Sequence, residues 1–203
     1  MDRRPVNRLL RLLPRLQAGT GDRRHRRPKE VSVSVTIREQ HPEDIEAIRG
    51  VNEKAFGQPQ ESHFVDALRS NGGVLLSLVA TVNSLVVGHI LYSPVSVGTE
   101  GEEVMGAGLG PMAVLPEYQR QGIGGKLIET GNQKLREAGC PFIVVVGHPE
   151  YYPRFGFKPA SGYGMKCEWD VPDNVFVVLV IDGSKMKGVS GLAKYRQEFS
   201  DVV

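Results

Sequence analysis

Three glycines stand close together where an amphipathic helix should begin, at Gly122, Gly124 and Gly125 in the stretch PEYQRQGIGGKLIETGNQKLREAG (116–139). Glycine costs about 1 kcal/mol relative to alanine inside a helix, so this spacing needs a compensating reason. The unpaired N–H groups and the dipole at a helix N-terminus attract an anion, and glycine lets a phosphate approach the main chain. The spacing therefore predicts a phosphate site at the start of this helix.

Two familiar phosphate loops do not fit these residues. A Walker A loop would need a glycine at Arg120 and a serine or threonine at Leu127. The dinucleotide fingerprint would also need its third glycine at Leu127. A nucleoside triphosphate or dinucleotide site of either kind is therefore excluded here.

The rest of the chain predicts the elements that must position this loop. Apolar alternation and β-rich runs predict strands at 31–39, 74–97 (a hairpin turning near Asn83-Ser84), 102–116, 141–147, 175–182 and 188–199. Helical spacing predicts helices at 41–56, at about 61–70 and in the glycine-led stretch ending at Gly139, with a short helical turn within 148–157. This order predicts a mixed α/β sheet with helices on both sides.

Charge divides the 203-residue chain into two parts. Residues 1–30 carry ten Lys or Arg and three acidic residues, whereas the remainder carries 15 basic and 20 acidic residues. We expect a basic, disordered extension over 1–30 and one domain over 31–203. The acidic balance of the domain argues against nucleic acid as its main ligand, while contact of the tail with an anionic surface stays open.

Cysteine usage and hydropathy predict the compartment. Cys140 and Cys167 form no disulfide framework and no paired metal spacing, and we expect both to be small core residues. No apolar run approaches the roughly 18 residues of a membrane helix. Together these features predict a protein of the reducing cytoplasm.

The loop also has a more specific pattern, since Gln119-Arg120-Gln121-Gly122-Ile123-Gly124 fits [QR]-x-x-G-x-[GA]. A strand ending in AVLP precedes it, an apolar strand follows about 20 residues later, and then comes YYPRFGF. In this combination the chain resembles the GNAT superfamily of N-acetyltransferases over roughly residues 33–182. The resemblance implies the GNAT fold, an α/β structure with a central mixed, mostly antiparallel sheet that splays between strands 4 and 5, and helices on both faces.

The same resemblance implies acetyl-CoA as cosubstrate, with no metal. Backbone amides from Arg120 to Lys126 would cradle the CoA pyrophosphate, and a strand edge at 112–114 would pair with the pantetheine amides. The implied cofactor-binding residues are Met112, Ala113, Val114, Arg120, Gln121, Gly122, Ile123, Gly124, Gly125 and Lys126.

A tyrosine shortly before a Gly-Phe pair commonly acts as the acid in this family, which implies Tyr152, with Tyr151 as the adjacent alternative. An asparagine that many members carry upstream of this tyrosine is missing from GHPEYY.

The general base stays open. His148 and Glu150 lie near the tyrosines in the sequence, whereas His89 and Ser93 lie on a predicted strand. An ordered water is a further alternative.

The activity implied is transfer of an acetyl group from acetyl-CoA to a primary amine by direct attack in a ternary complex. The acceptor is a small molecule or a protein, and residues 55–69 could shape its pocket, with Asp66 or Glu61 attracting a cationic amine or simply lining a solvated helical face. Two alternatives stay open: a catalytically silent GNAT-fold acyl-CoA sensor, and a domain tethered by its basic tail. The oligomeric state is open between monomer and homodimer.

Deletion of residues 1–30 should leave the melting temperature and the acetyl-CoA affinity nearly unchanged, because the predicted core pattern begins at about Val31. Thermal melts and calorimetric titrations of the full chain and the truncated chain check this. A large fall in melting temperature would show instead that the leucines of the tail dock on the domain.

Overall fold

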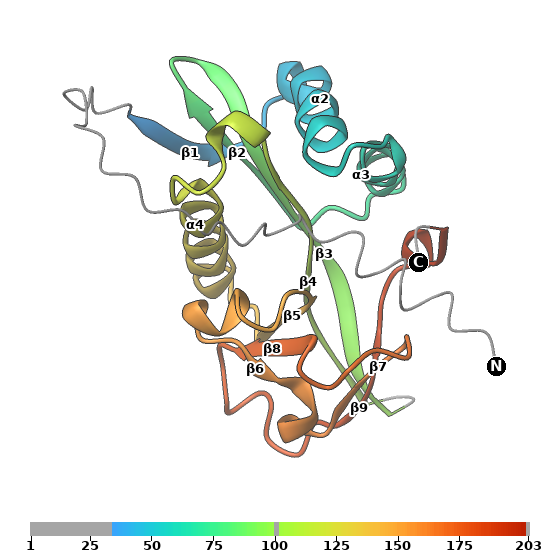
Figure 1. Ribbon diagram of the computed structural model, residues 1–203. Helices are drawn as coiled ribbons and strands as arrows, with labels where there is room; N and C mark the ends of the chain where they lie inside the picture. The colour runs from blue at the N-terminus through green and yellow to red at the C-terminus, as the bar shows by residue number, and fades with distance from the viewer. Residues whose placement is uncertain (1–33, 100–101, 202–203) are drawn as a thin grey trace.

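The computed structural model describes residues 34–99 and 102–201, so the predicted extension over 1–30 lies outside the described residues (Figure 1). The strands are Val35–Glu39 (β1), Leu76–Val82 (β2), Leu85–Thr99 (β3), Glu102–Val114 (β4), Phe142–Val146 (β5), Lys158–Pro159 (β6), Met165–Cys167 (β7), Phe176–Val180 (β8) and Gly191–Lys194 (β9). The α-helices are Ile45–Phe56 (α2), Gln60–Ser70 (α3) and Ile123–Glu137 (α4). Short 3₁₀ turns are Pro42–Asp44 (η2), Pro116–Tyr118 (η3), Tyr152–Phe155 (η4), Ala160–Tyr163 (η5) and Gln197–Asp201 (η6).

The predicted hairpin is formed by β2 and β3, which pair antiparallel and turn at Asn83 and Ser84. Both turn residues have positive φ, 48° and 67°. A two-residue turn of this hand matches the right-handed twist of the strands that it joins, and asparagine tolerates the conformation well. The turn predicted from the sequence is therefore confirmed.

The sheet runs in the order β1-β2-β3-β4-β5-β8-β6, and β9 adds to it beside β3 and β7. The neighbours β4 and β5 run parallel, and they pair only at Ala107 with Ile143 and at Gly108 with Val144. Beyond Gly108, β4 continues to Val114 beside β3, while no strand within residues 34–99 and 102–201 pairs with its other edge. The predicted mixed, mostly antiparallel sheet that opens between strands 4 and 5 is confirmed.

Helices cover both faces of this sheet, as predicted (Figure 1). Neighbouring residues of a strand point to opposite faces. A Cβ at Gly88 would lie 3.2 Å from Leu127 of α4, whereas the next residue, His89, contacts Asn52 of α2. Helix α4 thus packs on one face, and α2 with α3 on the other.

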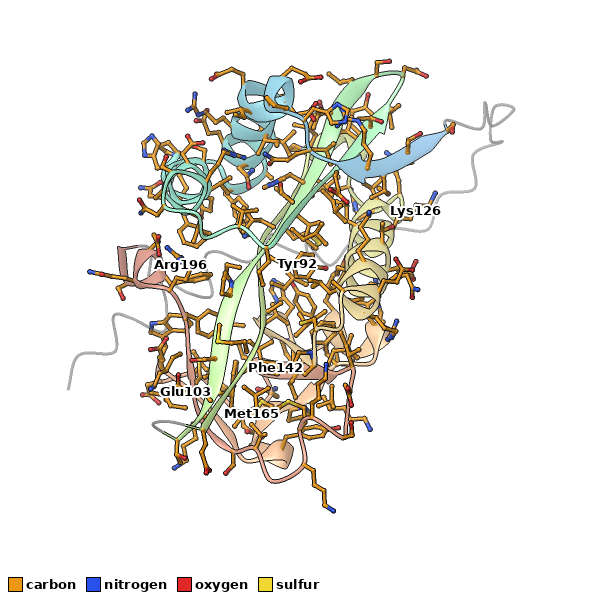
Figure 2. The ribbon with its side chains drawn as sticks, turned by 180° about the vertical axis from the view of Figure 1, so that it is seen from behind. Tyr92, Glu103, Lys126, Phe142, Met165 and Arg196 are labelled. Atoms are coloured by element: carbon orange, nitrogen blue, oxygen red, sulfur yellow. The ribbon has the colours of Figure 1, made fainter. Side chains whose placement is uncertain are left out.

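Helix α4 docks through four apolar side chains that are at most 6% exposed: Ile123, Leu127, Ile128 and Leu135. Burial of each stabilises the fold by about 1.5–3 kcal/mol. Tyr92 projects from β3 toward this helix, and a Cβ at Gly131 would overlap its ring (Figure 2). Glycine at 131 therefore lets the helix approach the sheet closely.

Two core clusters fill the layers. One joins β1–β4 to α2, α3 and α4 and extends to residues of β5 and β8, and the other joins the end of β3 to β5, β7, β8 and β9, where Phe142 and Met165 are buried (Figure 2). No helix within residues 34–99 and 102–201 is long and apolar enough to cross a membrane.

The last predicted strand, 188–199, is only partly a strand. It forms the short β9, Gly191–Lys194, and ends in η6. Strands β6 and β7 have two and three residues, too few to show a period in the sequence, and they were not predicted. The short helical turn predicted within 148–157 is confirmed as η4.

A polar network is buried between α2 and the sheet. The Nδ1 atom of His89 lies 3.2 Å from the Asn52 amide nitrogen, and its Nε2 atom lies 3.0 Å from Ser77 Oγ, which donates to Gln40. Because Asn52 can only donate from its nitrogen, His89 accepts at Nδ1 and carries its proton on Nε2. Burial, and to a lesser extent the charge of Arg69, lowers the pKa of His89 to about 3, so the ring is neutral.

The neutral His89 should make the free energy of unfolding depend on pH. Its pKa lies below that of the unfolded chain, near 6.5, so the unfolded state binds the extra proton and stability falls as the pH drops below about 6.5. Between pH 7 and pH 5 this one group should cost about 2 kcal/mol. Denaturant unfolding at both pH values measures the loss.

A pair of variants tests whether His89 causes this pH dependence of the free energy of unfolding. His89→Gln should flatten the dependence between pH 5 and pH 7, whereas His63→Gln, at an exposed position of α3, should retain it. If the slope persists in a folded His89→Gln protein, the buried imidazole is not its source.

Candidate functional site

The start of α4 has open hydrogen-bonding groups. Gly122 is the N-cap with φ 82° and gives no side-chain cap, and the first turn of the helix holds no acidic residue. The first helical bond that follows the cap runs from the Lys126 N–H to the Gly122 carbonyl. The N–H groups of Ile123, Gly124 and Gly125 precede it and have no intrahelical acceptor, which is the arrangement that favours an anion at a helix start.

The loop before the helix is held in shape by its own side chains. Gln119 donates to the Val114 carbonyl at 3.0 Å, and Gln121 donates to the Glu117 carbonyl at 3.0 Å. Between them Arg120 has a φ of 61°, an uncommon conformation for a residue with a side chain. Such a conformation persists only where the surroundings fix it, and it is frequent at ligand-binding loops.

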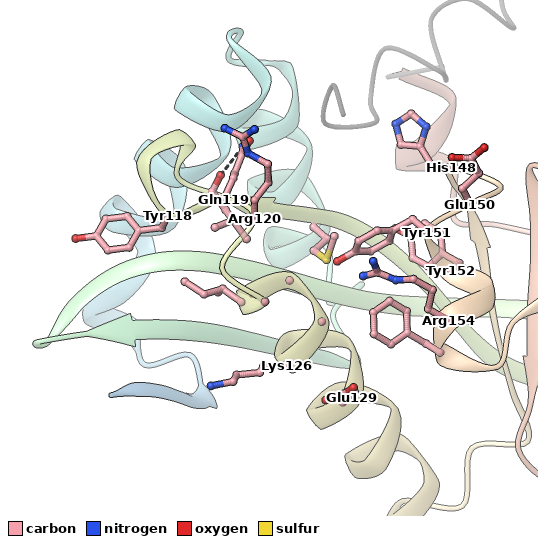
Figure 3. Close-up of a pocket in the computed structure, with 17 residues that line it drawn as sticks. Tyr118, Gln119, Arg120, Lys126, Glu129, His148, Glu150, Tyr151, Tyr152 and Arg154 are labelled. Atoms are coloured by element: carbon pink, nitrogen blue, oxygen red, sulfur yellow. Dashed lines mark hydrogen bonds between the residues drawn. The ribbon is translucent and has the colours of Figure 1, made fainter. Parts of the chain in front are cut away.

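A cavity of about 1010 Å³ opens at this helix start. It is lined by β4, by the loop and first turns of α4, and by the segment from His148 to Phe155 that follows β5. Figure 3 shows Arg120 and Lys126 on one side of it, with Tyr151, Tyr152 and Arg154 grouped on the other. The cavity thus connects the free edge of β4 with the uncapped helix end.

Tyr151 reaches across the cavity toward α4 (Figure 3). A Cβ at Gly124 would lie 2.8 Å from its hydroxyl oxygen and 3.5 Å from the sulfur of Met112 on β4. The guanidinium of Arg154 lies 4.7 Å from the centre of the Tyr151 ring, a cation–π contact. Three separate segments therefore converge at Gly124, where glycine leaves the main chain accessible.

Tyr152 is more deeply placed, with 6% of its surface exposed. Its ring packs edge-on against Tyr151 and Phe157, at centroid distances of 5.3 and 5.6 Å. A Cβ at Gly147, the residue after β5, would overlap the ring. Glycine at this position therefore leaves the space that the Tyr152 ring fills. Burial raises the pKa of Tyr152 far above its ordinary value, and the hydroxyl is a proton donor at neutral pH.

Of the eleven residues assigned from the sequence to the cofactor site and to the acid, nine line the cavity: Met112, Val114, Arg120, Gly122, Ile123, Gly124, Gly125, Lys126 and Tyr152. Two do not line it. The side chain of Ala113 is buried on a position paired with His89, and that of Gln121 bonds the loop backbone. Whether any of them binds a cofactor stays a prediction.

The structure places the candidates for the general base in two different environments. His148 and Glu150 line the cavity, whereas His89 and Ser93 are fully buried in the sheet outside it. Sequence reasoning did not single out Glu129 or Arg154, which also line the cavity. Glu129 lies one helical turn beyond Gly125, a spacing that could have revealed it.

The two cysteines are half-buried and free, away from these lining residues. The Cys140 thiol donates to the Phe142 carbonyl at 3.1 Å, and burial raises its pKa. Burial likewise raises the pKa of Cys167 to about 11. Neither thiol has the lowered pKa typical of a nucleophile.

Comparisons with known proteins agree with this geometry. A family model for an acetyltransferase (GNAT) domain matches residues 36–160. YhbS of Escherichia coli K12, named an uncharacterized N-acetyltransferase, is 33% identical over 165 residues, which are 81% of this chain and 98% of YhbS. YjhQ of the same strain, also named an uncharacterized N-acetyltransferase, is 39% identical over 133 residues, 64% of this chain and 74% of YjhQ.

Two solved structures extend the comparison to the fold. The E. coli YhbS complex with CoA matches with a TM-score of 0.78 and 31% identity, over 87% of this chain and 96% of that one. A GNAT family acetyltransferase from Brucella melitensis in complex with acetyl-CoA matches with a TM-score of 0.67 and 38% identity, over 82% and 98%. With its splayed sheet and uncapped glycine-led helix, the chain belongs to the GNAT family of acetyltransferases.

Proposed function

We propose that this protein transfers an acetyl group from acetyl-CoA to a primary amine by direct attack in a ternary complex. The observation that carries the proposal is the edge of β4 from 109 to 114, which pairs with no strand of the described residues, gives its Val114 carbonyl to Gln119, and leads to the uncapped start of α4. The edge of β4 supplies peptide groups for the pantetheine amides, and the start of α4 supplies N–H groups for the pyrophosphate. The solved structure from E. coli contains CoA and that from B. melitensis contains acetyl-CoA. Both support the binding of acetyl-CoA in the cavity of this protein.

Charge in the cavity supports the same placement of the cosubstrate. Arg120 and Lys126 flank the helix start, where the pyrophosphate carries its negative charge. Met112 and Val114 line the cavity from β4, so the pantetheine would run along them toward the opening of the sheet. The thioester would then lie near the tyrosine pair.

The reaction requires an unprotonated amine nitrogen to attack the thioester carbonyl carbon. The C–N bond forms, the carbonyl becomes a tetrahedral oxyanion, and the C–S bond then breaks as the carbonyl re-forms. The amine nitrogen loses a proton to a base or to water, and the departing thiolate gains one. Tyr152 is the proposed donor, because it lines the cavity and its raised pKa keeps the hydroxyl protonated.

Acetyl-CoA binding should depend on Gly124. Gly124→Val adds a side chain where the pyrophosphate should meet the backbone, and its Cβ would also displace the Tyr151 hydroxyl. Isothermal titration should show acetyl-CoA affinity reduced at least about tenfold, or about 1.4 kcal/mol. Gly50→Val is the matched control, since that glycine lies in α2 with no atom within 4 Å of its Cβ position. Unchanged affinity in a folded Gly124→Val protein would contradict the proposed cradle.

Variants of the two tyrosines should differ in their effects on the single-turnover rate and on the acetyl-CoA affinity. Tyr152→Phe keeps the ring and removes the donor, so the single-turnover rate should fall by roughly 100-fold, with acetyl-CoA affinity nearly unchanged. Tyr151→Phe should slow the chemistry much less and act mainly on cosubstrate affinity, because that hydroxyl lies over Gly124. Rapid-quench measurements with the best amine of a panel check both variants.

The outcomes of this comparison are distinct. Equal single-turnover rates for the wild-type protein and Tyr152→Phe would exclude Tyr152 as the acid, and a loss confined to Tyr151→Phe would transfer the role to that residue. Tight acetyl-CoA binding with no CoA release for any amine would support the sensor alternative.

A further inference from the structure

The side chain of Tyr151 narrows the cavity at the start of α4. A Cβ at Gly124 would lie 2.8 Å from the Tyr151 hydroxyl oxygen and 3.5 Å from the sulfur of Met112 on β4. A Cβ at Gly122, in contrast, would meet nothing within 4 Å. The cavity is therefore open at the N-cap of the helix and narrow at Gly124, two residues farther along the chain.

The space between the Tyr151 hydroxyl and Met112 is too small for a ligand atom. Both distances are measured from one point, so the oxygen and the sulfur lie no farther apart than the sum of the two. An atom that sits between two others needs about 3.5–4.0 Å on each side, and the sum falls short of this. The proposed path of the pantetheine, from the helix start along Met112, passes through this space.

A movement of Met112 alone would not open this path. Methionine is flexible and can yield to a ligand. The Tyr151 oxygen would still lie over Gly124, where the pyrophosphate should meet the main chain. The proposed placement of the cosubstrate therefore requires the Tyr151 hydroxyl to move.

Ring contacts hold Tyr151 in this position. The Arg154 guanidinium lies 4.7 Å from the centre of the Tyr151 ring, and the centre of the Phe155 ring lies 5.4 Å from it. Within residues 34–99 and 102–201, no hydrogen bond holds the Tyr151 hydroxyl. Ring contacts of this kind are individually weak, so the side chain can rotate without breaking a buried polar network.

The neighbours of Tyr151 fix the main chain that carries it. The Phe155 ring lies 3.5 Å from the position of a Cβ at Gly125, so it packs on the first turn of α4. Tyr152 is buried and packs edge-on against Tyr151, with 5.3 Å between the ring centres. The segment can thus keep its place while the Tyr151 side chain turns.

Tyr151 also lies between two parts of the cavity. Figure 3 shows Arg120 and Lys126 on one side of it and His148 with Glu150 on the other. The first part holds the proposed pyrophosphate site, and the second lies beside the proposed acid. A movement of Tyr151 would therefore connect the two parts.

We infer that Tyr151 is a gate for the cosubstrate, which enters only after this side chain has rotated away from Gly124. Arg154, stacked on the ring, holds the gate closed. The fraction of molecules with an open gate then limits the rate at which the cosubstrate associates. The inference rests on the proposed acetyl-CoA site, because the gate controls entry to it.

Association rates distinguish a gate from a fixed wall of the site. Tyr151→Ala removes the ring, so etheno-CoA, a fluorescent analogue of CoA, should associate at least about tenfold faster in stopped-flow measurements. Tyr163→Ala is the matched control and should associate as wild type, because Tyr163 is exposed and lies outside the cavity lining. Thermal melts show whether each variant is folded.

An unchanged association rate in a folded Tyr151→Ala protein would overturn the gate, even if dissociation became faster. The loss of a contact with a fixed wall acts mainly on the dissociation rate. If Tyr151→Ala does not fold, Tyr151→Phe decides the matter, since it keeps the ring and removes the oxygen over Gly124. Tyr151→Phe should also associate faster than wild type, and an unchanged rate would overturn the gate.

A further variant tests the role of Arg154. Arg154→Lys keeps the positive charge but loses the planar group that stacks on the ring, so it should speed association by a smaller factor than Tyr151→Ala. The double variant Tyr151→Ala, Arg154→Lys should associate no faster than Tyr151→Ala, because Arg154 acts through the ring. A further increase in the double variant would exclude Arg154 from the gate.

A parallel assay of CoA release from acetyl-CoA separates the gate from the proposed function. Acetyl transfer to an amine, with equal association rates for wild type and Tyr151→Ala, would contradict the gate alone. Faster association in Tyr151→Ala without acetyl transfer to any amine would support the gate and contradict the activity. Absence of etheno-CoA and acetyl-CoA binding by the wild-type protein would contradict both.

Discussion

The parting of β4 from β5 after Gly108 is the constraint on which the rest of the site depends. A strand edge inside a folded domain normally pairs, because unpaired peptide groups lose hydrogen bonds. Here the register between β3 and β4 shifts between Ile90 and Tyr92, so β4 bulges and turns away from β5. The gap leaves main-chain groups for a ligand at the centre of the molecule, between two covered faces.

Close packing holds the gap open and sets its shape. Helix α4 docks on the sheet at Gly88 and Gly131, where a Cβ would crowd Leu127 or the Tyr92 ring. This contact fixes the helix start beside the end of β4. In the same way, the Tyr152 ring packs directly against Gly147, where a Cβ would overlap it. Protein interiors pack densely, so these glycines determine where the cavity-lining side chains lie as firmly as the larger residues do.

Polar groups are distributed unequally over the two faces of the sheet. On the α2 side, hydrogen bonds join His89, Ser77, Asn52 and Gln40 into a buried network. Among the described residues, Asn52 Oδ1 in this network and side-chain oxygens of Glu61, Ser93 and Tyr195 are buried without a hydrogen-bond partner. A buried polar group without a partner costs stability.

The sequence by itself determined the order of the long elements, the turn at Asn83-Ser84 and the glycine-led start of α4, because these depend on short-range periodicity and backbone conformation. Only the tertiary structure showed that His89 is a buried structural group while His148 faces the cavity, since burial depends on residues far away in the chain. It also decided the course of residues 188–199, where β9 exists through its pairing with β3 and β7. Long-range packing also decided which aromatic rings meet, since no local pattern could bring together the rings of Phe64, Trp169, Tyr195 and Phe199.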